Sequence, residues 1–252
     1  MQAEPKPEIT EDHALGGRLR LKQPRRGHRF GHDGVLLAAA TEAGPGDHVV
    51  DFGAGVGIAG LAVAARVPDV RVTLIERDPF LAELAAENAR QNNFADRVSV
   101  LCADVCALQD CLHSGPADSV IMNPPFNDPR RGRPSPDPLR AAAHDGGGAV
   151  ISKWIEAAAD LLRPGGALTL IWRSDRRRDL LAALSPAFGD IRLCPVAPKP
   201  ATPAIRDLVR GRKGGTLSLF ELPALLLNED DGRPSSEAEA ILRRSAPIRL
   251  AP

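Results

Sequence analysis

A glycine-rich segment at residues 49–60 constrains the fold of this chain more than any other feature. It reads VVDFGAGVGIAG and joins a short apolar run to an Ala-rich run. Glycines in such a strand-to-helix turn let the backbone bend tightly and approach a ligand, while helix N–H groups point at it. Gly55, Gly57 and Gly60 also fit the dinucleotide-binding pattern G-x-G-x-x-G, which is a weak signal when it stands alone. The segment predicts a ligand-binding loop in an α/β domain.

Runs with strand and helix character alternate along the rest of the chain. Helices are predicted at 32–41, 58–66, 79–92, 149–162 and 179–184, and strands at 18–22, 49–52, 70–75, 98–102, 118–122, 167–172, 191–196 and 216–222. This alternation predicts a mostly parallel sheet with helices on both faces. The last two strands have no helix between them, which predicts an antiparallel hairpin at one edge. The Pro- and Arg-rich stretch at 197–215 is predicted to be an exposed loop.

Composition excludes several classes of protein. The 252 residues are 43% hydrophobic, and 32 Lys and Arg balance 32 Asp and Glu, which excludes a globally basic nucleic-acid protein but leaves room for local basic patches. No run reaches the ~18 apolar residues of a membrane span, and no apolar leader follows Met1, so we expect a cytoplasmic protein. We expect an arm with a short strand at 1–27, one domain at 28–228 and a tail at 229–252.

Three acidic residues follow or end successive predicted strands. Glu76 comes 19 residues after Gly57, where a carboxylate can accept both hydroxyls of a ribose. Asp51 comes two residues before the first glycine, Gly53, where it would repel a pyrophosphate but would suit an ammonium or sulfonium group. S-adenosylmethionine carries both cations, and Asp104 could accept from its adenine amine. The order of the three acids therefore predicts S-adenosylmethionine as the cofactor.

The most specific motif is Asn123-Pro124-Pro125-Phe126, directly after the predicted strand at 118–122. Each proline fixes its own φ, and Pro124 keeps Asn123 out of the helical region, so the turn is stiff. It presents the Asn123 side chain and the Pro124 carbonyl at the carboxyl edge of the sheet, where ligands of open α/β sheets bind. Two such acceptors can hold both hydrogens of a planar NH2 group while Phe126 stacks on the flat substrate. The motif predicts N-methylation of a base or an amide, promoted mainly by orientation.

With these motifs in this order, the chain resembles the class I S-adenosylmethionine-dependent methyltransferases over about residues 28–222. It looks most like the bacterial tRNA(Val) adenine-N6-methyltransferase family, on the segment GHRFGHDGVLLAAA at 27–40, the NPPF turn and LVRGRKGG at 208–215. The resemblance implies a Rossmann-like, seven-stranded, mostly parallel sheet whose final strand is antiparallel. It implies a cofactor site bordered by Phe30 and Asp33 and a tRNA adenine held by the NPPF turn. The implied cofactor ligands are Asp51, Gly53, Gly55, Gly57, Glu76 and Asp104.

Two basic groups are candidates for binding RNA phosphates. They are Arg25, Arg26 and Arg29 before the helix predicted at 32–41, and Arg210, Arg212 and Lys213 near the end of the domain. We expect both groups to lie beside the NPPF edge and to hold the phosphates around a base turned out of its stack. The family often has serine after Arg-Phe, whereas here Gly31 follows Phe30, and this departure bears on the substrate more than on the reaction.

Several alternatives stay open on the sequence. A guanine-N2 methyltransferase of rRNA uses the same turn, and a protein-glutamine N5-methyltransferase uses a similar one, although only about fifty residues precede Asp51 here. A nicotinamide-dependent Rossmann oxidoreductase would use the glycines but leaves the turn unexplained. A non-catalytic RNA-binding module would keep its binding after Asn123→Ala. His and Cys show no spacing typical of metal ligands, so we expect no metal.

Overall fold

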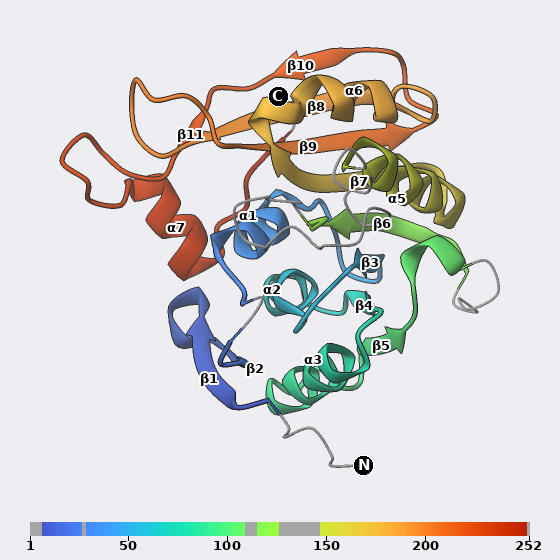
Figure 1. Cartoon of the computed structure of the whole chain (residues 1–252), viewed down its shortest axis with the longest axis vertical. Coiled ribbons are helices and arrows are strands. Elements are labelled where there is room, and N and C mark those ends of the chain that lie inside the picture. The colour runs from blue at the N-terminus through green and yellow to red at the C-terminus, as the bar shows by residue number, and fades with distance from the viewer. Residues whose placement is uncertain (1–6, 27–28, 109–114, 126–146, 251–252) are drawn as a thin grey trace, which may run out of the picture.

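A large mixed sheet and a separate two-stranded hairpin form the framework of the protein (Figure 1). The computed structural model describes residues 7–26, 29–108, 115–125 and 147–250. The main sheet has the strand order β10-β8-β9-β7-β6-β3-β4-β5, with β11 paired to β8. Its strands are β3 (His48–Phe52), β4 (Arg71–Glu76), β5 (Val98–Cys102), β6 (Ala117–Met122), β7 (Leu162–Arg173), β8 (Phe188–Ala197), β9 (Arg206–Lys213), β10 (Leu219–Glu221) and β11 (Leu225–Leu226).

The order of strands confirms the predicted fold class. Strands β3 to β8 run parallel to one another, and β9 lies antiparallel between β7 and β8. These seven strands, β3 to β9, form the expected mostly parallel sheet with an antiparallel seventh strand. The sheet grows in opposite directions from the β3–β6 pair, which creates the crevice where open α/β sheets bind ligands.

The antiparallel strand is not the one that the sequence predicts. Residues 206–213, expected within an exposed loop, form β9, whereas the strand expected at 216–222 shortens to β10 and pairs parallel to β8. Two charged residues of β9 are buried: Asp207 is 0% exposed and Arg210 is 5% exposed. Ion pairs with residues distant in sequence neutralise them, so their charge does not keep the segment at the surface.

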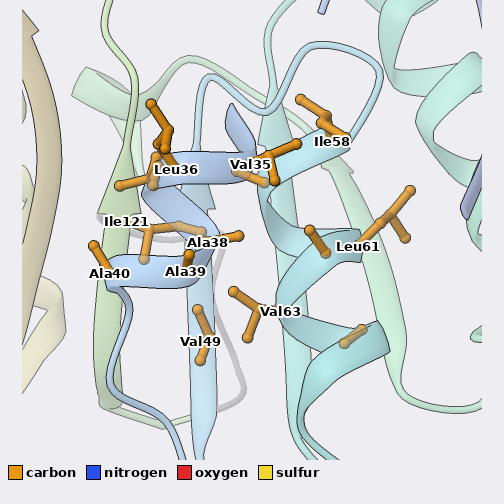
Figure 2. Close-up of a cluster of buried hydrophobic side chains, with 14 of the residues drawn as sticks. Val35, Leu36, Ala38, Ala39, Ala40, Val49, Ile58, Leu61, Val63 and Ile121 are labelled. Atoms are coloured by element: carbon orange, nitrogen blue, oxygen red, sulfur yellow. The ribbon is translucent and has the colours of Figure 1, made fainter. Parts of the chain in front are cut away.

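Helices cover both faces of the sheet, as expected. They are α1 (His32–Ala40), α2 (Ile58–Arg66), α3 (Pro79–Gln91), α5 (Gly147–Leu161), α6 (Arg177–Leu184) and α7 (Ser236–Arg244). One core lies between the sheet and α1, α2, α3 and α7, and Figure 2 shows its centre, where α1 and α2 meet Val49 and Ile121. The second core lies beneath α5 and α6 and includes Phe52 and Met122. The site at the carboxyl edge is thus held from both sides by packed apolar layers.

The arm and the tail predicted at the two ends of the chain both contain regular secondary structure within the described residues. The expected arm contains a second strand besides the one predicted at 18–22: β1 (Ile9–Ala14) pairs antiparallel with β2 (Leu19–Pro24), and the two form the hairpin beside α3 (Figure 1). In the predicted tail, α7 packs on α1, with Ile241 2% exposed. Ser235 caps α7 by accepting a hydrogen bond from the Ala238 N–H at 3.0 Å.

Candidate functional site

The glycine loop runs from the end of β3 to the start of α2. Gly53, Gly55 and Gly57 have φ values of 66°, 57° and 93°, in the left-handed region that favours glycine. A Cβ added to Gly53 would lie 2.6 Å from the Trp154 ring of α5, whereas one added to Gly55 would meet nothing within 4 Å. The loop is therefore packed against α5 at Gly53 and open at Gly55, where a ligand could approach its backbone.

Asp51 lies at the foot of this loop and is 2% exposed. One of its carboxylate oxygens accepts the Gly60 N–H of α2 at 2.9 Å. Burial raises the pKa of Asp51 to about 7, the nearby charge of Glu76 adds to the rise, and the Gly60 N–H opposes it. A cationic group bound beside Asp51 would favour the ionised carboxylate, so the site fits an ammonium or sulfonium ligand better than a phosphate.

Glu76 ends the neighbouring strand β4 and turns its carboxylate to the glycine loop. One oxygen accepts the Gly55 N–H at 2.8 Å, and the other accepts the Asp78 N–H at 2.9 Å. A carboxylate oxygen can accept two hydrogen bonds, so each oxygen keeps one position for a ligand hydroxyl. The third acid, Asp104, comes two residues after β5 and caps the 3-10 helix η2 (Val105–Ala107) by accepting the Cys106 N–H at 2.9 Å.

The Asn-Pro-Pro turn follows β6 at the same edge. Met122 pairs with Phe52 of β3, so Asn123 follows β6 as Gly53 follows β3. The side-chain oxygen Oδ1 of Asn123 is buried and accepts no hydrogen bond from the residues that the structure describes. Pro124 is buried and Pro125 is exposed, while Phe126 lies outside the described residues. A buried acceptor without a donor is costly unless a ligand supplies one.

Phe30 and Asp33 lie where α1 begins. The Phe30 N–H donates to Oε1 of Gln23 at 3.0 Å, and the Phe30 ring packs partly buried against the first core. Asp33 forms an ion pair with Arg206, the first residue of β9, at 2.9 Å. Because Arg206 pairs in register with Arg173 at the end of β7, this contact puts the start of α1 at the carboxyl edge of the sheet.

The two basic groups do not lie together, contrary to expectation. In the antiparallel strand β9, Arg212 pairs with Ala167 near the amino ends of the parallel strands, away from the Asn-Pro-Pro turn. Arg210 and Arg212 both bind Glu42 after α1, and Lys213 donates to the Leu162 carbonyl at 2.7 Å. The expected position of Arg210, Arg212 and Lys213 beside the turn is therefore wrong.

The other basic group precedes α1 on the carboxyl side. Arg25 pairs with Glu8 at 2.9 Å, and Arg29 pairs with Asp12 at 2.8 Å. Arg26 is exposed. This group therefore remains a candidate for contact with a polyanion near the site.

A cavity of about 440 Å³ lies at the opposite, amino edge of the sheet, between Glu42, Asp118, Arg163 and Arg212 among others. It is separate from the glycine loop and its carboxylates are already bonded, so it is not the site described above. In the described part of the chain, no cluster of His, Cys, Asp or Glu could hold a metal ion. No helix there is long and apolar enough to cross a membrane.

Sequence reasoning missed three residues that shape the site. Trp154 of α5 packs on Gly53, Gln23 of β2 binds the Phe30 backbone, and Asn88 of α3 binds the glycine loop at Val56. Trp154 and Asn88 come from elements distant in sequence from the residues they hold, whereas Gln23 is seven residues from Phe30. In the sequence, Asn88 could have been recognised only as a polar residue on the apolar face of a helix. It lies between Ala85 and Ala89, which are both buried.

Sequence comparison identifies relatives of this chain. A family model described as methyltransferase small domain matches residues 32–197. A tRNA1(Val) (adenine(37)-N6)-methyltransferase of Porphyromonas gingivalis is 36% identical over 158 residues, which are 60% of this chain and 61% of that protein. A protein of the same name from Bacteroides fragilis is 30% identical over 185 residues, which are 72% of this chain and 76% of that protein. The chain thus spans about three fifths of the first relative's length and three quarters of the second's.

Solved structures share the fold. A "predicted O-methyltransferase" from Agrobacterium tumefaciens superposes with a TM-score of 0.71 at 27% identity, covering 86% of this chain and 98% of that one. A 16S rRNA N2 methyltransferase from T. thermophilus, in complex with AdoMet and guanosine, has a TM-score of 0.58 at 19% identity and covers 84% of this chain and 53% of that one. The second likeness shows the fold alone. The sequence matches show that this chain belongs to the methyltransferase small domain family.

Proposed function

We propose that the protein is an S-adenosylmethionine-dependent N-methyltransferase that forms N6-methyladenosine in tRNA. Family membership and the relatives named as tRNA1(Val) adenine-N6-methyltransferases support the reaction and the substrate. The observation that carries the proposal is the buried Oδ1 of Asn123, which accepts no hydrogen bond from the described residues. Asn123 directly follows β6 as Gly53 directly follows the neighbouring strand β3, which supports an amine acceptor beside the glycine loop.

The cofactor side of the site fits S-adenosylmethionine. Asp51 is a buried carboxylate suited to a cation, and Glu76 keeps two acceptor positions for ribose hydroxyls. Gly55 leaves its backbone open to a ligand. We assign Asp51, Gly53, Gly55, Gly57, Glu76 and Asp104 to cofactor binding, with Phe30 and Asp33 at its border. When bound, this cofactor supplies the electrophilic methyl group.

The substrate side acts by orientation. The amine nitrogen of adenine is planar because its lone pair is delocalised into the ring. Asn123 Oδ1 and the Pro124 carbonyl would each accept one hydrogen of this amine, which turns the nitrogen lone pair toward the methyl group. The methylated nitrogen is acidic enough to lose its proton without a strong base, so the turn needs only neutral acceptors. Phe126 is proposed to stack on the adenine.

The segment that precedes α1 would bind the RNA. We assign Arg25, Arg26 and Arg29 to phosphate contacts, because this segment joins the carboxyl edge at Phe30 and Asp33. Arg210, Arg212 and Lys213 lie at the other edge, where they stabilise the end of β9. An extruded adenine would enter between α1 and the Asn-Pro-Pro turn.

Methyl transfer to separated RNA and protein fractions tests this function. Labelled S-adenosylmethionine is incubated with total tRNA, rRNA and protein, and the products are resolved by nucleoside and amino acid analysis. We expect N6-methyladenosine in tRNA, and a loss of at least about a hundredfold in kcat for Asn123→Ala with cofactor affinity nearly unchanged. The control is Asn228→Ala, which removes an asparagine bonded to the Pro198 carbonyl away from β3 and β6.

Other products would redirect the proposal. N2-methylguanosine in rRNA or methylglutamine in protein would keep the use of Asn123 but change the substrate. Absence of transfer together with absence of cofactor binding would contradict the methyltransferase function and favour the nicotinamide alternative.

A further inference from the structure

We propose that Asn88 of α3 is a positioning residue for the glycine loop, and that the β1–β2 hairpin is the support against which it works. The inference rests on the proposed function in one respect, namely that the glycine loop holds the cofactor. Asn88 lies outside every motif in the sequence, and it is 0% exposed. Its side chain binds the backbone of the loop at Val56, so it would act on the cofactor indirectly, through the loop.

Every hydrogen-bonding position of the Asn88 side chain is occupied. Its Nδ2 donates to the Val56 carbonyl at 2.9 Å and to the Lys22 carbonyl at 3.0 Å. Its Oδ1 accepts the Lys22 N–H at 2.7 Å and Nε2 of Gln91 at 2.9 Å. An amide side chain has two donor hydrogens and two acceptor lone pairs, so this network is complete. One side chain thus joins α3, the backbone of β2 and the glycine loop.

Asn88 contacts the part of the loop whose backbone its own sequence restricts least. Val56 stands between Gly55 and Gly57, which both have left-handed φ values. Glycine backbones accept many conformations, so the loop needs an outside contact to select one. The Val56 carbonyl and the Gly57 N–H belong to one planar peptide group, so fixing the first also orients the second. Asn88 therefore sets the direction of a peptide group at the start of α2.

The hairpin also holds the opposite wall of the site. Gln23 follows Lys22 in β2 and is 2% exposed. Its Oε1 accepts the Phe30 N–H at 3.0 Å, and its Nε2 donates to Asp12 of β1 at 2.8 Å. Consecutive residues of β2 are thus linked to the two segments assigned to the cofactor, the glycine loop through Asn88 and the lead-in to α1 through Gln23. The hairpin therefore fixes the distance between the glycine loop and the lead-in to α1.

The chain offers a matched control in Asn92, one turn further along. Its Nδ2 donates to the Arg20 carbonyl at 2.7 Å, and its Oδ1 accepts the Arg20 N–H at 3.0 Å. Asn92 therefore makes the same double contact with β2 that Asn88 makes at Lys22. None of its described bonds reaches the glycine loop. Loss of Asn92 removes a contact at Arg20 and leaves the links at Lys22 and Gln23 in place, whereas loss of Asn88 breaks the link at Lys22 and releases the loop.

Cofactor titration of Asn88→Ala and Asn92→Ala in the full chain tests the inference. Calorimetry with S-adenosylmethionine and S-adenosylhomocysteine gives Kd, and thermal unfolding gives Tm. We expect both variants to lower Tm, but only Asn88→Ala to raise Kd, by about tenfold for a lost hydrogen bond. With tRNA, the KM for S-adenosylmethionine should rise in Asn88→Ala while kcat at saturation stays near that of the wild type.

The results distinguish a failure of the positioning role from a failure of the proposed function. Equal changes in Kd for both variants, or a Kd for folded Asn88→Ala within twofold of the wild type, would overturn the positioning role. If Asn88→Ala does not fold, Asn88→Asp replaces it. This variant keeps the acceptor for the Lys22 N–H but loses the donors to the Val56 and Lys22 carbonyls. It must also raise the Kd for S-adenosylmethionine. Failure of the wild-type protein to bind the cofactor would instead contradict the proposed function.

Discussion

Glu76 accepts the backbone N–H of Gly55 at 2.8 Å, which ties the end of β4 to the glycine loop that follows β3. The same carboxylate accepts the Asp78 N–H, so neither oxygen is free to rotate away. The side chain that would bind a ribose is therefore also part of the support of the loop. Cofactor affinity and loop geometry should respond together when Glu76 is changed.

The first prediction concerns Glu76→Ala. The variant loses the contact with the glycine loop and the two acceptor positions that remain for a ligand. A hydrogen bond to a charged group contributes about 1.5–3 kcal/mol. The Kd for S-adenosylmethionine should therefore rise by roughly 10- to 100-fold. Isothermal titration calorimetry measures the change. The control is Glu83→Ala on α3, an exposed position that should bind as the wild type does. An unchanged Kd for Glu76→Ala would remove Glu76 from the cofactor site.

The second prediction concerns the pH dependence of cofactor binding. The pKa of Asp51 is raised to about 7, mainly by burial. A cationic ligand binds the ionised form better, so binding must release a proton where Asp51 is still protonated. The Kd for S-adenosylmethionine should therefore fall as pH rises from 6 to 8, by up to about tenfold per unit below pH 7. Asp51→Asn should bind weakly and lose this dependence; a wild-type Kd independent of pH would contradict the assignment.

The third prediction concerns stability at the same residue. In the unfolded chain Asp51 loses its proton near pH 4, whereas in the folded protein it keeps the proton up to about pH 7. Between these values the folded state binds more protons, so Asp51 lowers the free energy of unfolding as pH rises, by at most about 1.4 kcal/mol per unit. Urea unfolding at pH 5 and pH 8 should show a smaller pH-dependent loss for Asp51→Asn than for the wild type. Equal losses would mean that the folded protein does not raise the pKa of Asp51.

The fourth prediction concerns the packing of the glycine loop. Gly53→Ala adds a Cβ 2.6 Å from the Trp154 ring at a φ of 66°. Gly46→Ala places alanine at a φ of 84° with nothing within 4 Å, so it measures the backbone strain alone, about 1–2 kcal/mol. Gly53→Ala should cost about 1–3 kcal/mol more in unfolding free energy because of overpacking, and it should weaken cofactor binding. Chemical denaturation compares the two, and equal losses would exclude a clash with Trp154.

The fifth prediction separates the two basic groups. Arg26→Gln should weaken tRNA binding and reduce the slope of log affinity against log salt by about one, as expected for one phosphate contact. Lys213→Gln should leave both quantities unchanged, because Lys213 lies at the amino edge and donates to the Leu162 carbonyl. Filter binding at several salt concentrations measures the slopes. A loss confined to Lys213→Gln would reverse the proposed orientation of the RNA.

Local patterns were sufficient to predict the parallel half of the fold. The strand at 49–52 and the helix at 58–66 follow from apolar runs that a glycine loop interrupts, and both occur with bounds within a residue of those predicted. Strand β9 was missed because its charged residues indicate a surface loop when read alone. Arg177 supplies the partner of buried Asp207, and Glu42 supplies that of Arg210. Such pairs join residues far apart in sequence, so no local pattern contains them.

The candidate site, like the fold, was predictable from the sequence only in part. Asp51, Glu76 and Asp104 could be brought to one edge by counting strands, because the carboxyl ends of parallel strands meet there. The position of Arg210 relative to that edge depends on the direction of β9, which the sequence does not encode locally. Asn88 and Trp154 act across the fold, through a carbonyl and a ring contact that only the three-dimensional arrangement reveals.

The reversal of strand order between β3 and β6 also bears on how such a protein can diversify. The cofactor candidates Asp51, Glu76 and Asp104 lie on or just after β3, β4 and β5, whereas the Asn-Pro-Pro turn and the strands β7 and β9 lie on the other side of the reversal. Within the sheet, the two halves pair along β3 and β6 alone, with Phe52 opposite Met122. Changes in the second half can therefore alter the methyl acceptor while leaving the first half intact. Exchange of segments between relatives should therefore be tolerated best where it keeps the contacts that cross this line, such as Trp154 on Gly53 and Asp33 with Arg206.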